Sequence, residues 1–220
     1  MRFRPIGSIV DEIKNSGAKY IELHADNLTA DRDYAIELFK ALKPLSINWS
    51  GETTINLAND EELLQLAAAS GLHFLLVGLE TPSRSALDKS GKGFVSTHDV
   101  KRQVAAFHKY NIEVDSAFLF GFDEHDKSIF NETYEFVKEI DLDSTHSVIV
   151  IPFPGTHTFK TLKNEGRILT EDWSKYDGAH AVFQPQNMTP YELEQGAYEF
   201  YQKIDQLNKM KVGKRWNYFW

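Results

Sequence analysis

The sequence contains no cysteine among its 220 residues. Without thiols the chain forms no disulfide, offers no thiol nucleophile, and holds no cysteine-ligated zinc or iron–sulfur centre by itself. It also lacks any apolar run near the roughly 20 residues that a membrane-spanning helix requires, and the N-terminus has no signal-peptide pattern. We therefore expect a cytoplasmic protein without a membrane span.

Several common functional motifs are also missing. The sequence has no GxGxxG, no GxxxxGK[ST] and no GxSxG, so nucleotide-phosphate binding and serine hydrolase chemistry lack their usual signatures. The net charge of −8 argues against broad nucleic-acid binding, although a short basic and aromatic tail follows Lys209. The 42% of hydrophobic residues are enough for one sizeable core.

The apolar pattern along the chain switches repeatedly between a helical period and a strand period. Ser8 is expected to cap a first helix that Gly17 ends, and Asn59 with Glu62 resembles a capping box for a later helix. The helices alternate with five expected strands at Tyr20–Leu23, Ile47–Ser50, His73–Leu79, Asp115–Phe122 and Ser147–Phe153.

Such alternation predicts an α/β fold with a parallel sheet, either open and doubly wound or part of a β/α barrel. We favour a partial (β/α) barrel of about five parallel strands with a C-terminal helical extension. Residues 1–170 are expected to form the barrel and residues 171–220 to pack on it. The helix of the extension has a strong start signal, with Thr189 as N-cap, Pro190 in the first turn and Glu192 three residues on.

Polar residues follow the expected strands, where ligands bind in both of these architectures. His24 and Asp26 fall on the same side of the chain by strand periodicity, although Asp26 or Asn27 could instead cap the next helix. Glu80 follows the apolar run FLLVGL, where a carboxylate is costly unless it is solvated in a pocket or paired. Gly121 would permit the close approach of a ligand to the backbone.

Taken in order, these segments resemble the radical SAM superfamily, in particular its members with a cobalamin-binding domain upstream. The segments that carry the resemblance are RFRPIGSIVDEIKNSGAKYI, HADNLTADRDYA, WSGETTINLANDEEL, LLVGLET, SAFLFGFDEHD, IPFPGT and LKNEGRILTEDWSKYDGAHAVFQPQNMTPYEL. They extend from about Arg2 to Phe200. The resemblance implies a partial (β/α) barrel that binds S-adenosylmethionine across the carboxyl ends of its strands.

The resemblance also implies roles for the residues at the strand ends. Asp26 would contact the methionine amino group of S-adenosylmethionine, and Glu80 would bind the ribose hydroxyls. Apolar side chains and backbone near the later strand ends would contact the adenine ring. The implied cofactor-binding residues are Asp26, Asn27, Thr54, Asn56, Glu80, Phe120, Gly121, Pro152 and Phe153. No catalytic residue is assigned, and the substrate is left open.

The sequence departs from this family at one essential point. The family holds a 4Fe-4S cluster with CxxxCxxC after its first strand, and an electron from the cluster cleaves S-adenosylmethionine to a 5′-deoxyadenosyl radical. Neither that strand nor any cysteine is present in these residues. We expect a truncated portion of a longer enzyme, unable to hold its own cluster, with cobalamin possible only through a domain outside these residues.

Two other functions stay open. The first is a cluster-free binding or scaffold protein. The second is a barrel enzyme with a divalent metal, zinc or manganese, bound by His24, Asp26 and Glu80, with His125 as a further candidate ligand. If the family's first strand is missing, the strand Tyr20–Leu23 lies at a sheet border, and we expect self-association through that edge unless the C-terminal tail covers it.

Overall fold

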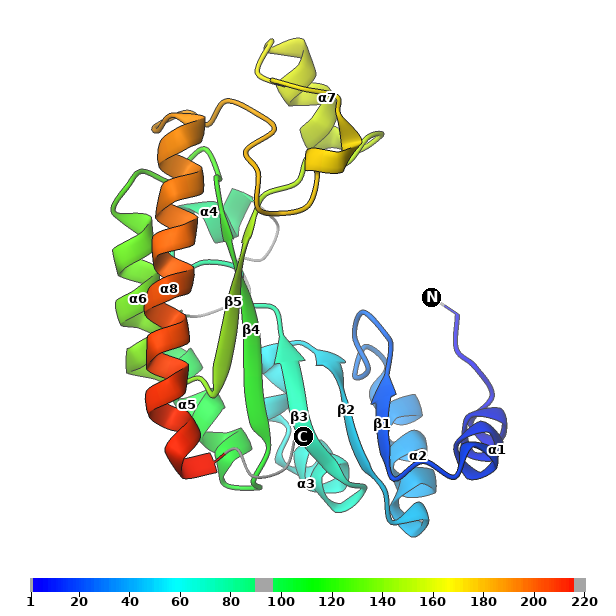
Figure 1. The fold of residues 1–220 in the computed structure, drawn as a ribbon. Helices are drawn as coiled ribbons and strands as arrows, with labels where there is room; N and C mark the ends of the chain where they lie inside the picture. The colour runs from blue at the N-terminus through cyan, green and yellow to red at the C-terminus, as the bar shows by residue number, and fades with distance from the viewer. Residues whose placement is uncertain (1, 90–96, 216–220) are drawn as a thin grey trace. The chain divides into compact units, whose positions relative to one another are not determined.

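The computed structural model describes residues 2–89 and 97–215 (Figure 1). The strands are β1 (Tyr20–Leu23), β2 (Asn48–Thr53), β3 (Leu72–Val77), β4 (Glu113–Phe120) and β5 (Ser144–Ile149). The helices are α1 (Ile6–Ser16), α2 (Arg32–Leu42), α3 (Glu61–Ala69), α4 (Arg84–Lys89), α5 (Thr97–His108), α6 (Ile129–Ile140), α7 (His157–Asn164) and α8 (Pro190–Arg215). Short 3-10 helices are η1 (Lys43–Leu45), η2 (Ile55–Asn59) and η3 (Trp173–Lys175).

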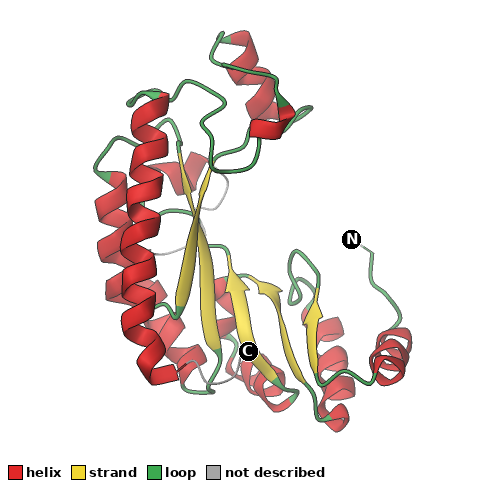
Figure 2. Cartoon of the chain, viewed as in Figure 1, coloured by secondary structure: helices red, strands yellow, loops and turns green. Residues whose placement is uncertain are grey.

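The five strands form one open parallel sheet in the order β1-β2-β3-β4-β5. Helices alternate with the strands along the chain (Figure 2), which is the pattern of a partial β/α barrel and confirms the predicted fold class. β1 is the first strand in this order, so the segment Tyr20–Leu23 lies at a sheet border as expected, and Tyr20 is 61% exposed. Self-association through this edge stays a prediction, and residues 216–220 of the tail lie outside the described residues.

The chain divides into two compact units that interleave along the sequence. The first contains the residues up to Gly78, His98–Ser116 and Ile140–Leu142, and the second contains Leu79–Thr97, Ala117–Glu139 and the residues from Asp143. Both units therefore draw on segments that are distant in sequence. The predicted boundary at residue 170 stays a prediction.

The core of the first unit lies between β2 and its helices. Trp49 on β2 is almost fully buried and stacks on Phe39 of α2, with 5.3 Å between the ring centroids. The indole Nε1 of Trp49 donates to Ser70 Oγ at 3.0 Å, which satisfies the polar atom of this buried ring. Burial of two large aromatic side chains against the sheet fixes α2 on one face of β2.

The core of the second unit lies where α6 and α8 run along β4 (Figure 1). Phe120 of β4 contacts Phe130 of α6 and Phe200 of α8, with centroid distances of 4.8 and 5.1 Å. A Cβ atom on Gly196 of α8 would come within 2.1 Å of the Phe130 ring, so glycine is what lets the two helices approach. The C-terminal helix is thus an integral part of this core.

Two helix starts differ from the sequence prediction. α1 begins at Ile6 after Pro5, and the Ser8 hydroxyl donates to Pro5 O within the first turn instead of capping the helix. α3 is capped by Asp60, whose Oδ1 accepts from Leu63 N at 3.1 Å, and not by Asn59. Proline is favoured at helix starts, and two adjacent Asx residues compete for one cap, so local sequence could not select between these possibilities.

Candidate functional site

In the first unit, the loop after β1 is fastened to the end of β2. Asn27 Oδ1 accepts from Thr53 Oγ1 at 2.7 Å and from Thr29 N at 3.1 Å, and Thr29 Oγ1 also contacts Thr53 Oγ1. Leu28 N donates to Glu52 O at 2.9 Å. The structure therefore brings Asn27 together with Thr53, a buried residue at the end of β2 that is not among the predicted site residues.

The other predicted residues of the first unit are more open. Asp26 and Asn56 are exposed, and Thr54 is half-buried. Thr54 is the residue before the 3-10 helix η2, and its carbonyl accepts from Leu57 N at 3.2 Å. Asp26 thus lies in the loop after β1, Thr54 directly precedes η2, and Asn56 lies within η2.

In the second unit, Glu80 occupies an unusual backbone conformation just beyond β3. Its φ is +65°, and Thr81 N donates to Leu79 O at 2.8 Å, which makes Glu80 the central residue of a three-residue turn of the rare γ type. Leu119 N of β4 donates to Glu80 O at 2.7 Å. A non-glycine residue at positive φ costs free energy, and such residues concentrate at functional sites.

A buried polar pair lies directly behind this turn. Thr81 Oγ1 lies 3.1 Å from His125 Nε2, and the two residues are only 2% and 1% exposed. Thr81 Oγ1 also accepts from Ser83 N at 3.1 Å. Burial lowers the pKa of His125 to about 4, so the imidazole is neutral at physiological pH. The sequence prediction mentioned His125 only as an optional metal ligand.

Phe120 and Gly121, at the end of β4, meet protein side chains. The Phe120 ring is fully buried between α6 and α8, and the Phe120 carbonyl accepts a hydrogen bond from Val150 N at 2.9 Å. Gly121 has a φ of +105°, and a Cβ at this position would lie 3.0 Å from Leu193 and 3.1 Å from Phe183. The absence of a side chain at Gly121 therefore lets Leu193 and Phe183 of the C-terminal extension approach the backbone closely.

The loop after β5 contains Pro152 and Phe153. Pro152 is buried, whereas Phe153 is 58% exposed. The carbonyl of Phe153 accepts from Thr156 Oγ1 at 2.6 Å, and the same hydroxyl caps α7 by accepting from Phe159 N at 3.2 Å. The loop is therefore built as the start of α7, with one aromatic ring left open to solvent.

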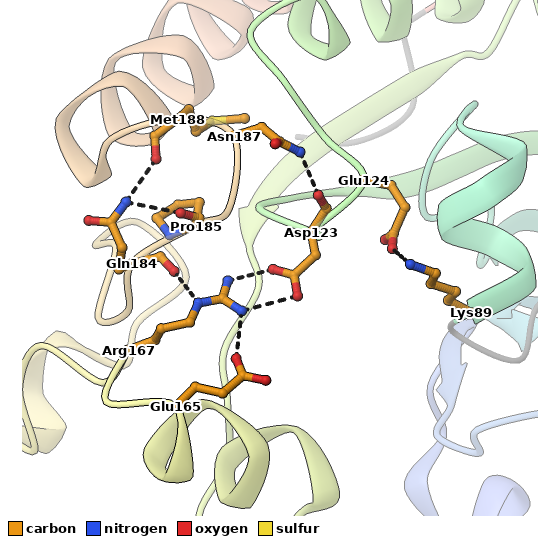
Figure 3. A network of polar contacts seen from close by, with 9 residues as sticks. All are labelled: Lys89, Asp123, Glu124, Glu165, Arg167, Gln184, Pro185, Asn187 and Met188. Carbon is orange, nitrogen blue, oxygen red and sulfur yellow. Dashed lines mark hydrogen bonds and ion pairs between the residues drawn. The ribbon is translucent and has the colours of Figure 1, made fainter.

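The loop after β4 is also joined to the C-terminal extension by a polar network (Figure 3). The guanidinium of Arg167 binds both carboxylate oxygens of Asp123 and donates through Nε to Gln184 O at 2.8 Å. Asn187 Nδ2 donates to Asp123 O at 2.7 Å. Glu124 pairs with Lys89 of α4. Neither Asp123 nor Arg167 is among the predicted site residues, and no local sequence pattern marks Arg167.

The predicted site residues are therefore divided between the two units. Asp26, Asn27, Thr54 and Asn56 belong to the first unit, and Glu80, Phe120, Gly121, Pro152 and Phe153 belong to the second. Across residues 2–89 and 97–215, no group of three or more His, Cys, Asp or Glu side chains is arranged to hold a metal ion. The structure thus gives no support to the zinc or manganese alternative.

Comparison with known proteins gives a consistent set of relatives, although no family model matches the chain. The bacteriochlorophyllide d C-12(1)-methyltransferase of Chlorobaculum tepidum is 26% identical over 228 residues, which cover 100% of this chain and 50% of that protein. The bacteriochlorophyllide d C-8(2)-methyltransferase of the same organism is 26% identical over 87% of this chain and 42% of that protein. The chain spans about half the length of the curated relatives it matches.

Among solved structures, the radical S-adenosylmethionine methyltransferase TsrM from Kitasatospora setae, with cobalamin and a [4Fe-4S] cluster bound, matches with a TM-score of 0.66. The match covers 88% of this chain and 41% of that chain at 16% sequence identity. The chain is similar in fold to this radical SAM enzyme. The similarity agrees with the resemblance that the sequence motifs indicated and with the predicted partial barrel.

The chain lacks the ligands that the radical SAM family uses to hold its 4Fe-4S cluster. It has no thiolate with which to bind an iron–sulfur cluster, and its described residues offer no substitute set of ligands. The residues present therefore do not fit the cluster.

No helix of the described part of the chain has the length and apolar character to cross a bilayer. The cytoplasmic location stays a prediction.

Proposed function

We propose that this chain is the S-adenosylmethionine-binding barrel of a radical SAM methyltransferase. The observation that carries the proposal is the conformation of Glu80, which is held at positive φ in a γ-turn at the strand end where the family resemblance places the ribose-binding acid. Such strain persists only where the surrounding structure over-determines it. The methyltransferase names of the two curated relatives support the reaction class.

The roles proposed for the individual residues are those that the family resemblance implies. Asp26 contacts the amino group of the methionine moiety, and Asn27, Thr54 and Asn56 supply further polar contacts. In the second unit, Glu80 accepts hydrogen bonds from the ribose hydroxyls. The adenine ring lies beside the strand end formed by Phe120 and Gly121, next to the apolar residues Pro152 and Phe153. When bound, S-adenosylmethionine supplies the methyl or adenosyl group for the reaction.

The proposal stops at cofactor binding by the residues of this chain. Because the chain lacks cysteine, any 4Fe-4S cluster would be ligated by residues outside these 220, and cobalamin would require a domain outside them as well. We therefore assign no step of radical formation to this chain. That the chain is a portion of a longer enzyme stays a prediction.

A cluster-free binding or scaffold protein is the second candidate, and the absence of cysteine favours it. Such a protein would keep the barrel and the pocket for S-adenosylmethionine. Saturable binding with no turnover after reconstitution with cysteine-bearing segments of a relative would indicate this function, whereas turnover would indicate the methyltransferase portion.

Calorimetry with S-adenosylmethionine and S-adenosylhomocysteine tests the proposed pocket. We expect weak, saturable binding of one ligand per chain, and an affinity at least about tenfold lower in Glu80→Gln, because hydrogen bonds to a charged acceptor contribute about 1.5–3 kcal/mol. Glu37→Gln, an exposed change on α2, is the matched control and leaves the affinity unchanged. A folded protein that binds neither ligand, or equal affinities in Glu80→Gln and the wild type, would overturn the proposal.

A further inference from the structure

Three consecutive ionisable residues after β4 each bind a different segment of the second unit. Asp123 binds Arg167, just after α7, and Asn187 of the C-terminal extension, and Glu124 binds Lys89 of α4 (Figure 3). The third residue, His125, contacts Thr81 in the loop after β3. The first two contacts join surface segments, whereas the third is fully buried and adjoins the strained Glu80.

The backbone around Glu80 is held from β4 and from the loop that follows it. On the β4 side, Leu119 N donates to Glu80 O at 2.7 Å. On the loop side, His125 Nε2 lies 3.1 Å from Thr81 Oγ1, the side chain of the next residue. Because Thr81 N also closes the γ-turn by donating to Leu79 O at 2.8 Å, any shift of Thr81 changes the turn itself.

A turn at positive φ relaxes to an ordinary conformation unless its neighbours prevent it. The contact between His125 and Thr81 is one of these constraints, and it fixes the residue directly after Glu80. We infer that His125 is a positioning residue that, through the Thr81 hydroxyl, holds the γ-turn of Glu80 and so orients its carboxylate. Binding of ribose by the oriented carboxylate rests on the proposed function. The constraint that His125 places on the γ-turn does not.

The surroundings of His125 are unfavourable for an imidazole that does not hold Thr81 in place. Its Nδ1 is buried and has no hydrogen-bond partner among the described residues, which is unfavourable for a polar atom removed from water. The Phe122 ring lies nearly perpendicular to the imidazole ring, with 5.1 Å between the ring centroids. The charged groups that act on it are Glu124 and Asp126, on its own loop. A neutral apolar residue would avoid this cost but would lose the bond to Thr81.

Thr81→Val and His125→Leu remove the two halves of this contact. Thr81→Ser and His125→Gln keep a hydrogen-bonding group at each position and serve as rescue variants. The matched control is Thr133→Val, which removes another buried hydroxyl of the same unit, on α6, whose Oγ1 has no partner among the described residues. Because Val is nearly isosteric with Thr, Thr81→Val tests the contact even if His125→Leu fails to fold.

Amide hydrogen exchange of the protein without ligand tests directly whether the contact between His125 and Thr81 constrains the γ-turn of Glu80. We expect the Leu119 and Thr81 amides, which close the bonds around Glu80, to exchange at least about tenfold faster in Thr81→Val and in His125→Leu. Thr81→Ser and His125→Gln restore most of the protection, and Thr133→Val does not change it. Unchanged exchange in both Thr81→Val and His125→Leu would overturn the inference while leaving the proposed function untouched.

The affinity for S-adenosylhomocysteine then separates positioning from general stability. Thr81→Val lowers the affinity several-fold in a protein that has Glu80, and causes no further loss when combined with Glu80→Gln, because the two changes affect one contact. An equal loss in both backgrounds contradicts positioning through Glu80. If the wild type binds no ligand, the proposed function fails, and the exchange experiment alone decides the role of His125.

Discussion

Arg167 binds both carboxylate oxygens of Asp123, and the same guanidinium donates through Nε to the carbonyl of Gln184. The Arg167 side chain is only 12% exposed, so this bond is shielded from water on the arginine side. Asp123 lies two residues beyond Gly121, at the end of β4. One arginine therefore joins the C-terminal extension to the loop that carries Asp123, Glu124 and His125.

Loss of this arginine is expected to weaken the second unit. Arg167→Ala lowers the free energy of unfolding by about 1–3 kcal/mol, because it leaves Asp123 and the carbonyl of Gln184 without their donor. Arg167→Lys recovers only part of this, since an ammonium group cannot reproduce the planar fork. Urea denaturation gives the values. Lys163→Ala, which breaks an exposed pair with Glu171, is the control and costs less than about 1 kcal/mol. Equal losses in the two alanine variants would contradict this account.

Gly121 is expected to tolerate no side chain. Gly121→Ala combines a positive φ with a Cβ only 3.0 Å from Leu193 and 3.1 Å from Phe183, and we expect it to lower the free energy of unfolding by about 2–4 kcal/mol. Gly155→Ala has a similar φ of +86° but nothing within 4 Å of the new Cβ, so it costs only the backbone strain of about 1–2 kcal/mol. Thermal or urea unfolding of the pair measures the contribution of the extension against β4. The prediction fails if the two variants are equally stable.

Because the pKa of His125 is lowered in the folded state, we expect the protein to lose stability in mild acid. Its folded-state pKa is lowered from an ordinary value of 6.5 to about 4, so the unfolded state binds more protons between these two values. Stability therefore falls as the pH drops from about 6.5 toward 4, by up to about 3 kcal/mol from this group. Urea denaturation at pH 7 and pH 5 measures the change, and His125→Gln removes this contribution. A wild type and a His125→Gln variant with identical pH dependence would show that His125 is not buried as a neutral imidazole.

The start of α8 depends on a reciprocal cap. Thr189 Oγ1 accepts from Glu192 N at 3.2 Å, and Glu192 Oε2 accepts from Thr189 N at 2.8 Å. Thr189→Ala is expected to lower the free energy of unfolding by about 1 kcal/mol, and Thr189→Ser to keep most of it, because serine retains the capping hydroxyl. Denaturation curves that do not separate the two variants would show that the cap contributes nothing measurable.

The sequence predicted the elements well where a local signal decides them. The strand Tyr20–Leu23 has the predicted bounds, and Thr189 with Glu192 forms the predicted capping box. Gly17 ends the first helix in the left-handed conformation, as expected. These features depend on residues within a few positions of one another, which is the range over which periodicity and capping act.

The site was predicted less completely because its decisive contacts are long-range. Thr81 and His125 are 44 residues apart in sequence, and so are Asp123 and Arg167. Nothing in the local pattern of a single sequence pairs such residues, and the γ-turn at Glu80 has no glycine to mark it. The apolar run before Glu80 still indicated that this carboxylate has a specific role, because a charge there is costly without one.

Ligand-dependent hydrogen exchange at saturating S-adenosylhomocysteine tests the central claim, the location of the cofactor site, most directly. We predict increased protection in three segments: residues 24–30 after β1, residues 78–83 around Glu80 and residues 119–123 after β4. Residues 37–42 of α2 and 198–204 of α8 should show no change. In Glu80→Gln the protection of residues 78–83 should be lost at the same ligand concentration. Protection confined to other segments, or identical in Glu80→Gln, would contradict the claim that these strand ends bind the cofactor.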